Sequence, residues 1–296
     1  METPSDPASP GLHDSKVCIV TGASSGLGES IAVMFAQRGA SVTLCGRDEN
    51  RLQSALTSCT EVSGGHGERF ITVEGDVRDS ATRKHIVQKT LETFGRLDVL
   101  VASAGVSDEG MDILTATEHT YDLVMDTNVK AVFFQIQEAV PHLQNHAGNI
   151  VVISSNTSQF AHPTTTYPMS KAAVDHMVRC LAVDLGPKDI RVNSVNPGFV
   201  PTRIITRFVG MCVDRSFSHQ IECWNACGPL LLTTSRREPI LSFSLSLLIL
   251  GIRNVVFYFL LGECLFYEQD FQMLFIWCAC KYLSILCISI LGKFLF

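Results

Sequence analysis

The chain has 296 residues, of which 46% are hydrophobic and 18% charged, and its formal net charge at pH 7 is −6. These values exclude collagenous and wholly disordered chains and allow one large domain or two modest ones. The acidic balance, with no local basic patch, also excludes a typical nucleic-acid binder.

The first 14 residues are predicted to be a flexible segment. They contain no basic start followed by an apolar run, so they do not resemble a secretory signal, and we expect a cytoplasmic location. The four cysteines before residue 209 lack CxxC spacing, which favours small buried side chains over a metal site. No metal is expected.

From residue 16 onward, compact apolar runs alternate with amphipathic stretches of helical period. The expected strands are 16–23, 41–45, 70–73, 99–102, 149–154 and 191–195, and the expected helices are 29–38, 49–58, 80–94, 127–143 and 167–185. Strands that are apolar on both faces predict a doubly wound α/β fold, a parallel sheet with helices on both faces, over residues 15–208. Such a sheet binds ligands beyond the carboxyl ends of its strands.

The first predicted strand is followed directly by a glycine-rich turn. Residues 21–28 read TGASSGLG and lead into a helix. Gly22 permits a tight turn, Gly26 allows the backbone to approach a pyrophosphate, and Gly28 allows close packing of helix and strand. A turn that merely needs glycines is the alternative interpretation.

Further motifs follow in a fixed order: Asp76-Val77, Ala104-Gly105, Ser155, Tyr167-Pro-Met-Ser-Lys171 and Asn196-Pro197-Gly198. With TGxxxGxG they give the chain a resemblance to the short-chain dehydrogenase/reductase family over residues 14–206. The resemblance implies a Rossmann-like fold, NAD or NADP as cofactor, and hydride transfer between the nicotinamide and an alcohol or carbonyl carbon of a small molecule.

The resemblance also implies a set of cofactor-binding residues. These are Gly22, Ser24, Ser25, Gly26, Leu27, Gly28, Arg47, Asp76, Val77, Ser103, Ala104, Gly105, Tyr167, Lys171, Pro197, Gly198, Val200 and Thr202. One departure from the family pattern is Ser103, where an asparagine is usual.

The end of the second predicted strand bears on the choice between NAD and NADP. NAD-specific enzymes of this fold usually place an acidic residue there, whereas a 2′-phosphate needs cations. This chain has Gly46 followed by Arg47, whose guanidinium can bind phosphate through two hydrogen bonds. We therefore expect NADP(H) to be favoured over NAD(H), although Arg47 could also be an ordinary solvated cation.

Tyr167 and Lys171 form the expected acid/base pair. A phenol with a pKa of about 10 needs a nearby cation to exchange protons near neutral pH, and positions i and i+4 of a helix share a face. The resemblance implies that a serine binds the substrate oxygen: alignment of the strand favours Ser155, whereas counting back from Tyr167 selects Ser154. It also implies a proton-relay role for Asn128, which could alternatively cap a helix.

The composition changes near residue 209. Residues 209–238 are predicted to be a polar connector, and residues 239–296 a hydrophobic tail. The tail contains only six of the 52 charged side chains of the chain. Two apolar stretches, 239–262 and 271–292, are long enough to cross a bilayer of about 30 Å. We expect an apolar helical tail that is a membrane anchor, a buried subdomain, or the product of unspliced or alternative coding sequence.

The tail replaces the last strand and the substrate-covering helix that the family would supply. The edge of the sixth strand should then be exposed. Three functions remain open: an NADP(H)-dependent oxidoreductase, a catalytically impaired dinucleotide-binding or dimerising protein, and a membrane-anchored reductase of lipid-like substrates with contact through 239–292. The resemblance further implies a homodimer or homotetramer formed by the helices near Thr127 and Tyr167.

Overall fold

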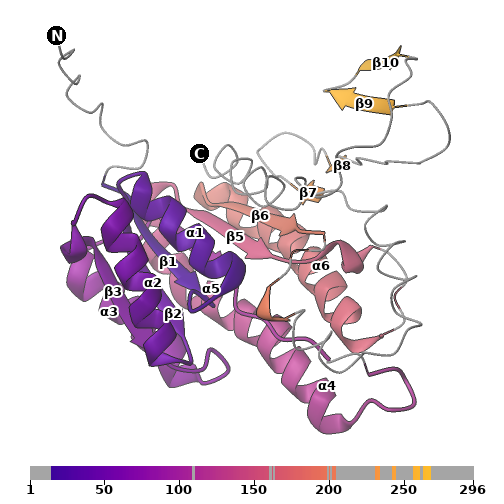
Figure 1. Ribbon diagram of the computed structural model, residues 1–296, viewed down its shortest axis with the longest axis horizontal. Coiled ribbons are helices and arrows are strands. Elements are labelled where there is room, and N and C mark those ends of the chain that lie inside the picture. The colour runs from indigo at the N-terminus through magenta and orange to yellow at the C-terminus, as the bar shows by residue number, and fades with distance from the viewer. Residues whose placement is uncertain are drawn as a thin grey trace.

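The computed structural model (Figure 1) describes residues 15–108, 111–159, 162, 164–198, 200 and 202–204, together with the backbone of four short strands further along the chain. The flexible segment predicted at residues 1–14 lies outside the described residues, as do most of the connector and the tail.

Six parallel strands form the centre of the sheet, in the order β3-β2-β1-β4-β5-β6. Their bounds are β1 Val17–Thr21, β2 Ser41–Gly46, β3 Phe70–Glu74, β4 Val99–Ala102, β5 Asn149–Ile153 and β6 Arg191–Asn196. The chain order reverses between β1 and β4, and Thr21 at the end of β1 pairs with Ala102 at the end of β4. A doubly wound sheet binds ligands at this switch point.

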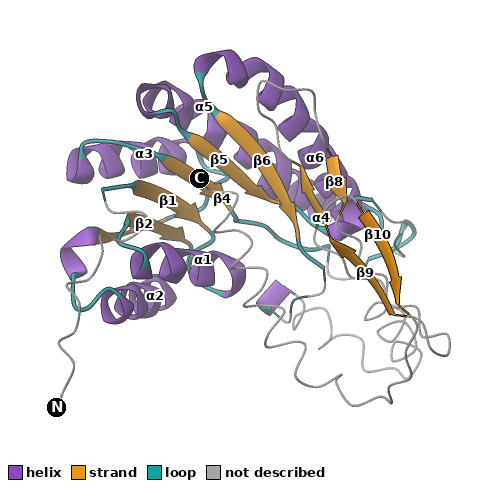
Figure 2. Cartoon of the chain, turned by 90° about the horizontal axis from the view of Figure 1, so that it is seen from above, coloured by secondary structure: helices purple, strands orange, loops and turns teal. Residues whose placement is uncertain are grey.

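Helices cover both faces of this sheet, as predicted (Figure 2). Side chains from α1 and α2 pack in one core cluster, and those from α3, α5 and α6 pack in the other. The helices are α1 Gly26–Gln37, α2 Glu49–Val62, α3 Ser80–Phe94, α4 Glu118–Met125, α5 Ala131–Leu143 and α6 Thr166–Leu185. Short helical turns are η1 Gly67–Arg69, η2 Asp126–Lys130, η3 Gln144–His146, η4 Asn156–Ser158 and η5 Gly186–Lys188.

Strand β1 shows why the sequence forms this sheet. Cys18 and Val20 contribute to the cluster beneath α1 and α2, whereas Ile19 between them contributes to the opposite cluster. All three are fully buried. Because successive side chains of a strand point to opposite faces, a run that is apolar at every position requires cover on both sides.

The helix predicted to start at Thr127 starts earlier. Helix α4 begins at Glu118, and Thr117 caps it by accepting a hydrogen bond from the Thr120 amide. The π-helical turn η2 then connects α4 to α5. Asn128 therefore lies inside a long helical segment and does not cap one. Such π-turns occur mostly as single turns within α-helices, often at functional sites.

Beyond residue 208 the structure describes four strands, one in the connector and three in the tail, and the described parts of the tail are not the helix that we expected. Strand β7, Leu231–Thr233, pairs antiparallel with the last three residues of β6 and so covers that half of the edge that was expected to be exposed, and β8, Ser242–Ser244, pairs with β7. Strands β9, Val256–Leu260, and β10, Glu263–Tyr267, form an antiparallel pair. Their aromatic and β-branched residues favour strands.

Among the described residues, no helix is both long enough and apolar enough to span a bilayer. The second apolar stretch, 271–292, lies outside them, so the predicted membrane contact there stays a prediction.

Candidate active site

An open cavity of about 260 Å³ lies at the carboxyl ends of β1 and β4. Every residue of the predicted cofactor set lines this cavity, and so do Ser155, Tyr167 and Lys171. Asn128 is buried behind the cavity and does not line it. The switch point of the sheet therefore brings together motifs that are far apart in the sequence.

The glycine turn fits tightly between β1 and α1. Gly22 has a positive φ of 70°, which favours glycine, and a Cβ on Gly28 would lie 2.3 Å from the Gly22 carbonyl oxygen. The turn can therefore hold α1 close to β1 only with glycine at position 28. The amino terminus of α1 consequently faces the cavity, where its free N–H groups and helix dipole favour an anion.

The loop after β4 is anchored by Thr21. The Thr21 hydroxyl oxygen accepts hydrogen bonds from the Ser103 amide at 3.1 Å and the Ala104 amide at 3.2 Å. Ser103 in this loop is the departure from the family pattern noted in the sequence. These backbone hydrogen bonds hold the loop without the asparagine that is usual in the family.

Asp76 and Val77 form the cavity wall beyond β3. Arg78 donates two hydrogen bonds to the Asp76 carboxylate, at 2.8 and 3.1 Å from different nitrogens, and Arg47 lies 3.9 Å from it. Burial acts to raise the pKa of Asp76, but the hydrogen bonds and charge of Arg78, with a contribution from Arg47, lower it below its ordinary value. Asp76 is therefore an anion at neutral pH.

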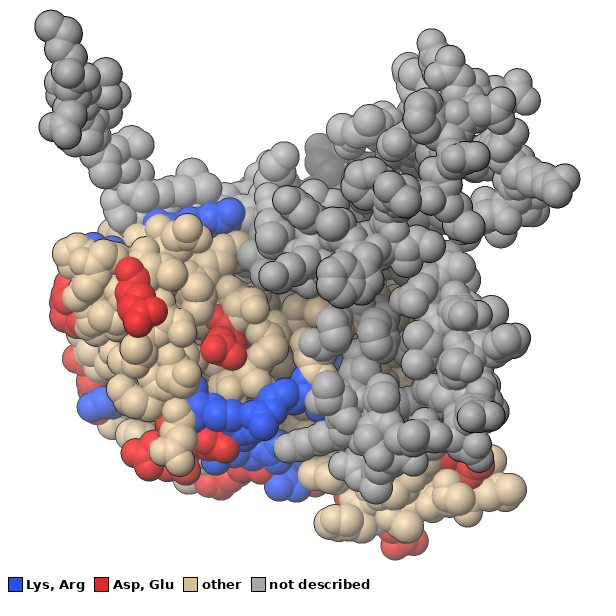
Figure 3. Space-filling model, viewed as in Figure 1, with Lys and Arg blue, Asp and Glu red and all other residues tan. Residues whose placement is uncertain are grey.

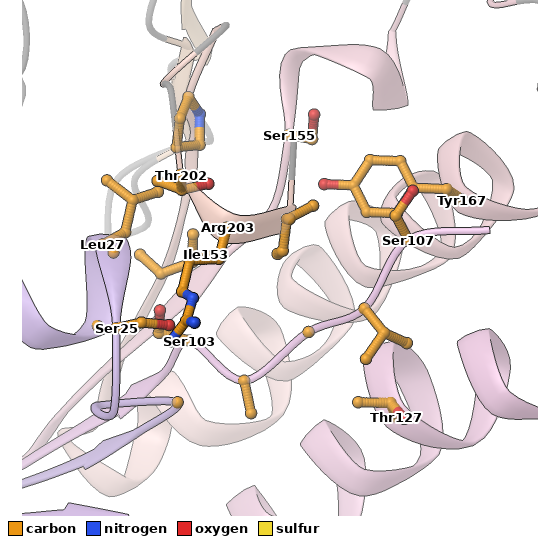
Figure 4. Close-up of a pocket in the computed structure, with 18 of the residues that line it drawn as sticks. Ser25, Leu27, Ser103, Ser107, Thr127, Ile153, Ser155, Tyr167, Thr202 and Arg203 are labelled. Atoms are coloured by element: carbon orange, nitrogen blue, oxygen red, sulfur yellow. The ribbon is translucent and has the colours of Figure 1, made fainter. Parts of the chain in front are cut away.

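Tyr167, near the start of α6, points its hydroxyl toward Ser155 (Figure 4). Burial raises the pKa of Tyr167, a hydrogen bond with Ser155 lowers it, and the charge of Asp108 raises it again. The Ser155 oxygen also accepts hydrogen bonds from the Thr157 hydroxyl at 2.9 Å and the Thr157 amide at 3.2 Å. Because both acceptor positions of Ser155 are used, its own proton is left for Tyr167 or for a substrate oxygen.

Ser154 has a different environment. Its hydroxyl donates to the Lys171 carbonyl at 3.3 Å and is buried against α6. Of the two serines that the sequence left open, the structure thus places the hydroxyl of Ser155 beside Tyr167.

Lys171 is buried, with 6% of its surface exposed. Its ammonium donates to the Ile153 carbonyl at 2.9 Å and lies 5.7 Å from the centre of the Tyr167 ring. Burial lowers the pKa of Lys171 to about 8, and the negative charge of Asp175 acts in the opposite direction. Lys171 and Tyr167 are neighbours, but the hydrogen bond that Tyr167 receives comes from Ser155.

Asn128 connects the loop after β4 to α6. Its side-chain oxygen accepts from the Val106 amide at 2.9 Å, and its side-chain nitrogen donates to the Val106 carbonyl at 2.9 Å and to Ser170 at 3.0 Å. A Cβ on Gly105 would lie 3.3 Å from Asn128 and 3.6 Å from the Lys171 nitrogen. The side chain of Asn128 therefore positions the groups around Lys171.

Several cavity residues were missed by the sequence reasoning. Asp108 is almost fully buried, and its carboxylate accepts a hydrogen bond from the Tyr167 amide at 2.9 Å, which fixes the start of α6. The other polar residues in this group are Thr157, His162, Thr164, Arg51 and Arg203, and Arg203 projects into the cavity in Figure 4. None belongs to a motif that marks it, because their roles depend on contacts between distant segments.

The fold and the cavity are those of a Rossmann-like nucleotide-binding domain. A model of the short chain dehydrogenase family matches residues 16–209. A 3-oxoacyl-acyl-carrier-protein reductase from Thermotoga maritima is 35% identical over 191 residues, which cover 64% of this chain and 76% of the reductase.

Solved structures show the same similarity. Carveol dehydrogenase from Mycobacterium avium in complex with NAD has a TM-score of 0.61 and 32% identity, with 66% of this chain and 74% of that chain covered. A short chain dehydrogenase from Burkholderia cenocepacia in complex with NADP has a TM-score of 0.60 and 32% identity, with 65% and 77% covered. The chain belongs to the short-chain dehydrogenase/reductase family, and it is an oxidoreductase of the class that uses nicotinamide cofactors.

Proposed function

We propose that this protein transfers a hydride between NADP(H) and a secondary alcohol or carbonyl compound, with Tyr167 as the acid/base. The observation that carries the proposal is the hydrogen-bonded pair of Tyr167 and Ser155 in the same cavity as the glycine turn and the amino terminus of α1. A cavity with a helix amino terminus that can bind an anion at one end and a proton donor at the other fits a dinucleotide with a small substrate.

The chemistry of the chain's own residues follows from their environments. When bound, the nicotinamide supplies or accepts the hydride. Ser155 donates a hydrogen bond to the substrate oxygen and so fixes the position of that oxygen beside Tyr167. The burial that raises the pKa of Tyr167 keeps the phenol protonated at neutral pH, so that Tyr167 can give its proton to the oxygen as negative charge develops there.

Lys171 supports this step. In its protonated form the ammonium stabilises the phenolate that Tyr167 becomes, at a ring-centre distance of 5.7 Å. Its hydrogen bond to the Ile153 carbonyl fixes the ammonium next to the end of β5, where Ser155 follows.

Three features support NADP(H) over NAD(H). A Cβ at Gly46 would lie 2.9 Å from the Cβ of Ser24, so an acidic side chain at the end of β2 has no room. Arg47, with half of its side chain exposed, and Arg51 line the cavity beside it. In Figure 3, basic side chains form a band across the visible face, with acidic ones next to it.

The balance of charge near Arg47 is also positive. Arg47 and Arg78 face the single carboxylate of Asp76, and Arg51 pairs with Asp48 at 2.8 Å. Three guanidinium groups thus share two carboxylates in these pairs, which leaves N–H groups that can bind a 2′-phosphate.

The test is titration of the full chain with NADPH and NADH, followed by fluorescence, for the wild type and Arg47→Asp. We expect the preference for NADPH to fall by roughly 10- to 100-fold, since a charge-assisted hydrogen bond contributes about 1.5–3 kcal/mol. Arg179→Asp makes the same charge change at an exposed position of α6 outside the cavity and should leave the preference unchanged. An unchanged preference in Arg47→Asp would overturn the NADP assignment. NADPH binding without turnover of any ketone would favour a non-catalytic binding protein.

Pairing between copies of the chain is part of the same proposal. Phe133 and Phe134 on α5 are partly exposed, and their rings contact each other edge to face with 5.2 Å between the ring centres. Val132 and Ile136 on the same helix are buried against the sheet. The exposed pair supports contact with a second copy through α5, as the family resemblance implies.

A further inference from the structure

A cluster of buried polar side chains lies behind the cavity and joins three elements. Asp175 on α6 accepts hydrogen bonds from Ser158 on η4 at 2.5 Å and from Asn196 at the end of β6 at 2.7 Å. Asn196 also lies within hydrogen-bond distance of Ser158, at 3.0 Å. None of these three residues lines the cavity, so they can act on the reaction only through other residues.

Each element in the cluster carries part of the proposed active site. The Asn196 side chain donates to the Ser155 carbonyl at 3.1 Å. The Asn156 amide, next in the chain, donates to the Pro197 carbonyl at 3.0 Å. Asp175 itself stands one helical turn after Lys171 on α6. A single carboxylate therefore connects the segment of Ser155, the segment of Pro197 and the helix of Lys171.

Burial of this carboxylate is costly in free energy unless a charge nearby compensates. Asp175 is 3% exposed, and its second oxygen, Oδ1, has no hydrogen-bond partner within the described part of the chain. Lys171, one turn earlier, is the buried cation whose pKa the charge of Asp175 raises against the larger lowering by burial. The two charges stabilise each other across the helix face.

We propose that Asp175 is a positioning residue, which holds the backbone of Ser155 through Asn196 and places a fixed negative charge one helical turn from Lys171. This inference rests on the proposed function, since it assigns a role to residues of the same site.

Three other ionisable groups are considered near Lys171. Tyr167 lies on the same helix, Asp108 comes from the loop after β4, where it accepts from the Tyr167 amide, and His162 comes from the segment before α6. Burial lowers the pKa of His162, so it is neutral at pH 8. Of the two carboxylates named in this region, Asp175 lies on α6 and shares the Asn196 side chain with the Ser155 carbonyl, whereas Asp108 contacts the start of α6.

The test compares urea unfolding of the full chain between pH 6 and pH 10 in four forms: wild type, Asp175→Asn, Lys171→Met and the double variant. The difference in free energy of unfolding between a form with Lys171 and the same form with Lys171→Met reports the titration of Lys171. This measurement requires neither cofactor nor turnover. In the wild type this difference should begin to rise near pH 8, which marks the titration midpoint of Lys171 in the folded chain, and in Asp175→Asn that midpoint should move down by about one pH unit. Asp184→Asn, an exposed change of equal charge on α6, should leave the midpoint where it is.

An unmoved midpoint in Asp175→Asn would overturn the proposal. Should that variant fail to fold, Asn196→Ala provides the second test, because it releases the Ser155 carbonyl and keeps the carboxylate. We expect this variant to turn over NADPH and ketone about tenfold more slowly, which corresponds to an increase of about 1.4 kcal/mol in activation free energy. The titration midpoint of Lys171 should be unchanged. Full activity would overturn the positioning role. A shifted midpoint in Asp175→Asn together with no turnover by the wild type would instead contradict the proposed function and leave the electrostatic role intact.

Discussion

Replacement of Lys171 by methionine should inactivate the protein without destabilising it at neutral pH. Burial lowers the pKa of Lys171 from 10.5 to about 8. A shift of this size corresponds to about 3 kcal/mol, because each unit is worth about 1.4 kcal/mol. Since the pKa is depressed in the folded state, the ammonium destabilises the fold at pH 7, where Lys171 is charged in both the folded and the unfolded chain.

Methionine removes that cost and fills similar space, but it leaves the Ile153 carbonyl without its 2.9 Å donor. The lost charged hydrogen bond costs about 1.5–3 kcal/mol, so the two effects nearly cancel. At pH 7, Lys171→Met should therefore unfold with a free energy equal to that of the wild type or up to about 2 kcal/mol higher, whereas its turnover of NADPH and ketone should be lost.

The pH dependence of the free energy of unfolding gives a more specific prediction. Between the folded pKa of about 8 and the unfolded value of 10.5, the unfolded chain binds more protons at Lys171 than the folded chain does. The free energy of unfolding of the wild type should then rise by about 1–2 kcal/mol relative to Lys171→Met between pH 7 and pH 9.5. Urea unfolding at several pH values measures this difference. Lys188→Met, at an exposed position, should follow the wild type throughout. A difference that stays constant or falls with pH would refute the reasoning.

Two further substitutions test the positioning of the site. Thr157→Val removes the hydroxyl that donates to Ser155 at 2.9 Å and should reduce kcat by roughly fivefold with little effect on NADPH binding, since a neutral hydrogen bond contributes about 1 kcal/mol. Steady-state kinetics measures both, and an unchanged kcat would contradict the role of Thr157. Gly28→Ala places a Cβ 2.3 Å from the Gly22 carbonyl oxygen. This substitution should lower the free energy of unfolding by about 1–3 kcal/mol and abolish NADPH binding. The control variant Gly186→Ala, whose Cβ would meet nothing within 4 Å, should change neither property. Full NADPH affinity in Gly28→Ala would show that the turn does not need this close approach.

The fold was predictable from the sequence because its central strands, such as β1, carry apolar residues on both faces. Ile19 and its neighbours Cys18 and Val20 can be buried together only in a sheet covered on both faces. The glycine turn was equally readable, since the close contact of Gly28 is a local requirement of the strand–turn–helix unit. The apolar tail was not: Val256–Leu260 fits a membrane helix by hydropathy, but its β-branched and aromatic residues pair as a strand with Glu263–Tyr267.

Several features of the site could not be predicted because they depend on tertiary contacts. The π-helical turn that carries Asn128 has no signature in hydrophobic periodicity. Asp108 reads as an ordinary loop acid, and only the folded chain brings it to the Tyr167 amide, 59 positions away. The choice between Ser154 and Ser155 is similar, because one residue of shift at a strand end reverses the direction of a side chain.

The central claim is that Tyr167, held by Ser155, donates a proton in a hydride transfer that uses NADPH. The most direct measurement is NADPH binding by fluorescence to the full chain in mild detergent, followed in the same sample by oxidation with a panel of small ketones and quinones, for the wild type and Tyr167→Phe. The account predicts saturable NADPH binding by both and turnover by the wild type alone. Equal turnover by Tyr167→Phe, or a folded wild type that binds no NADPH, would contradict it.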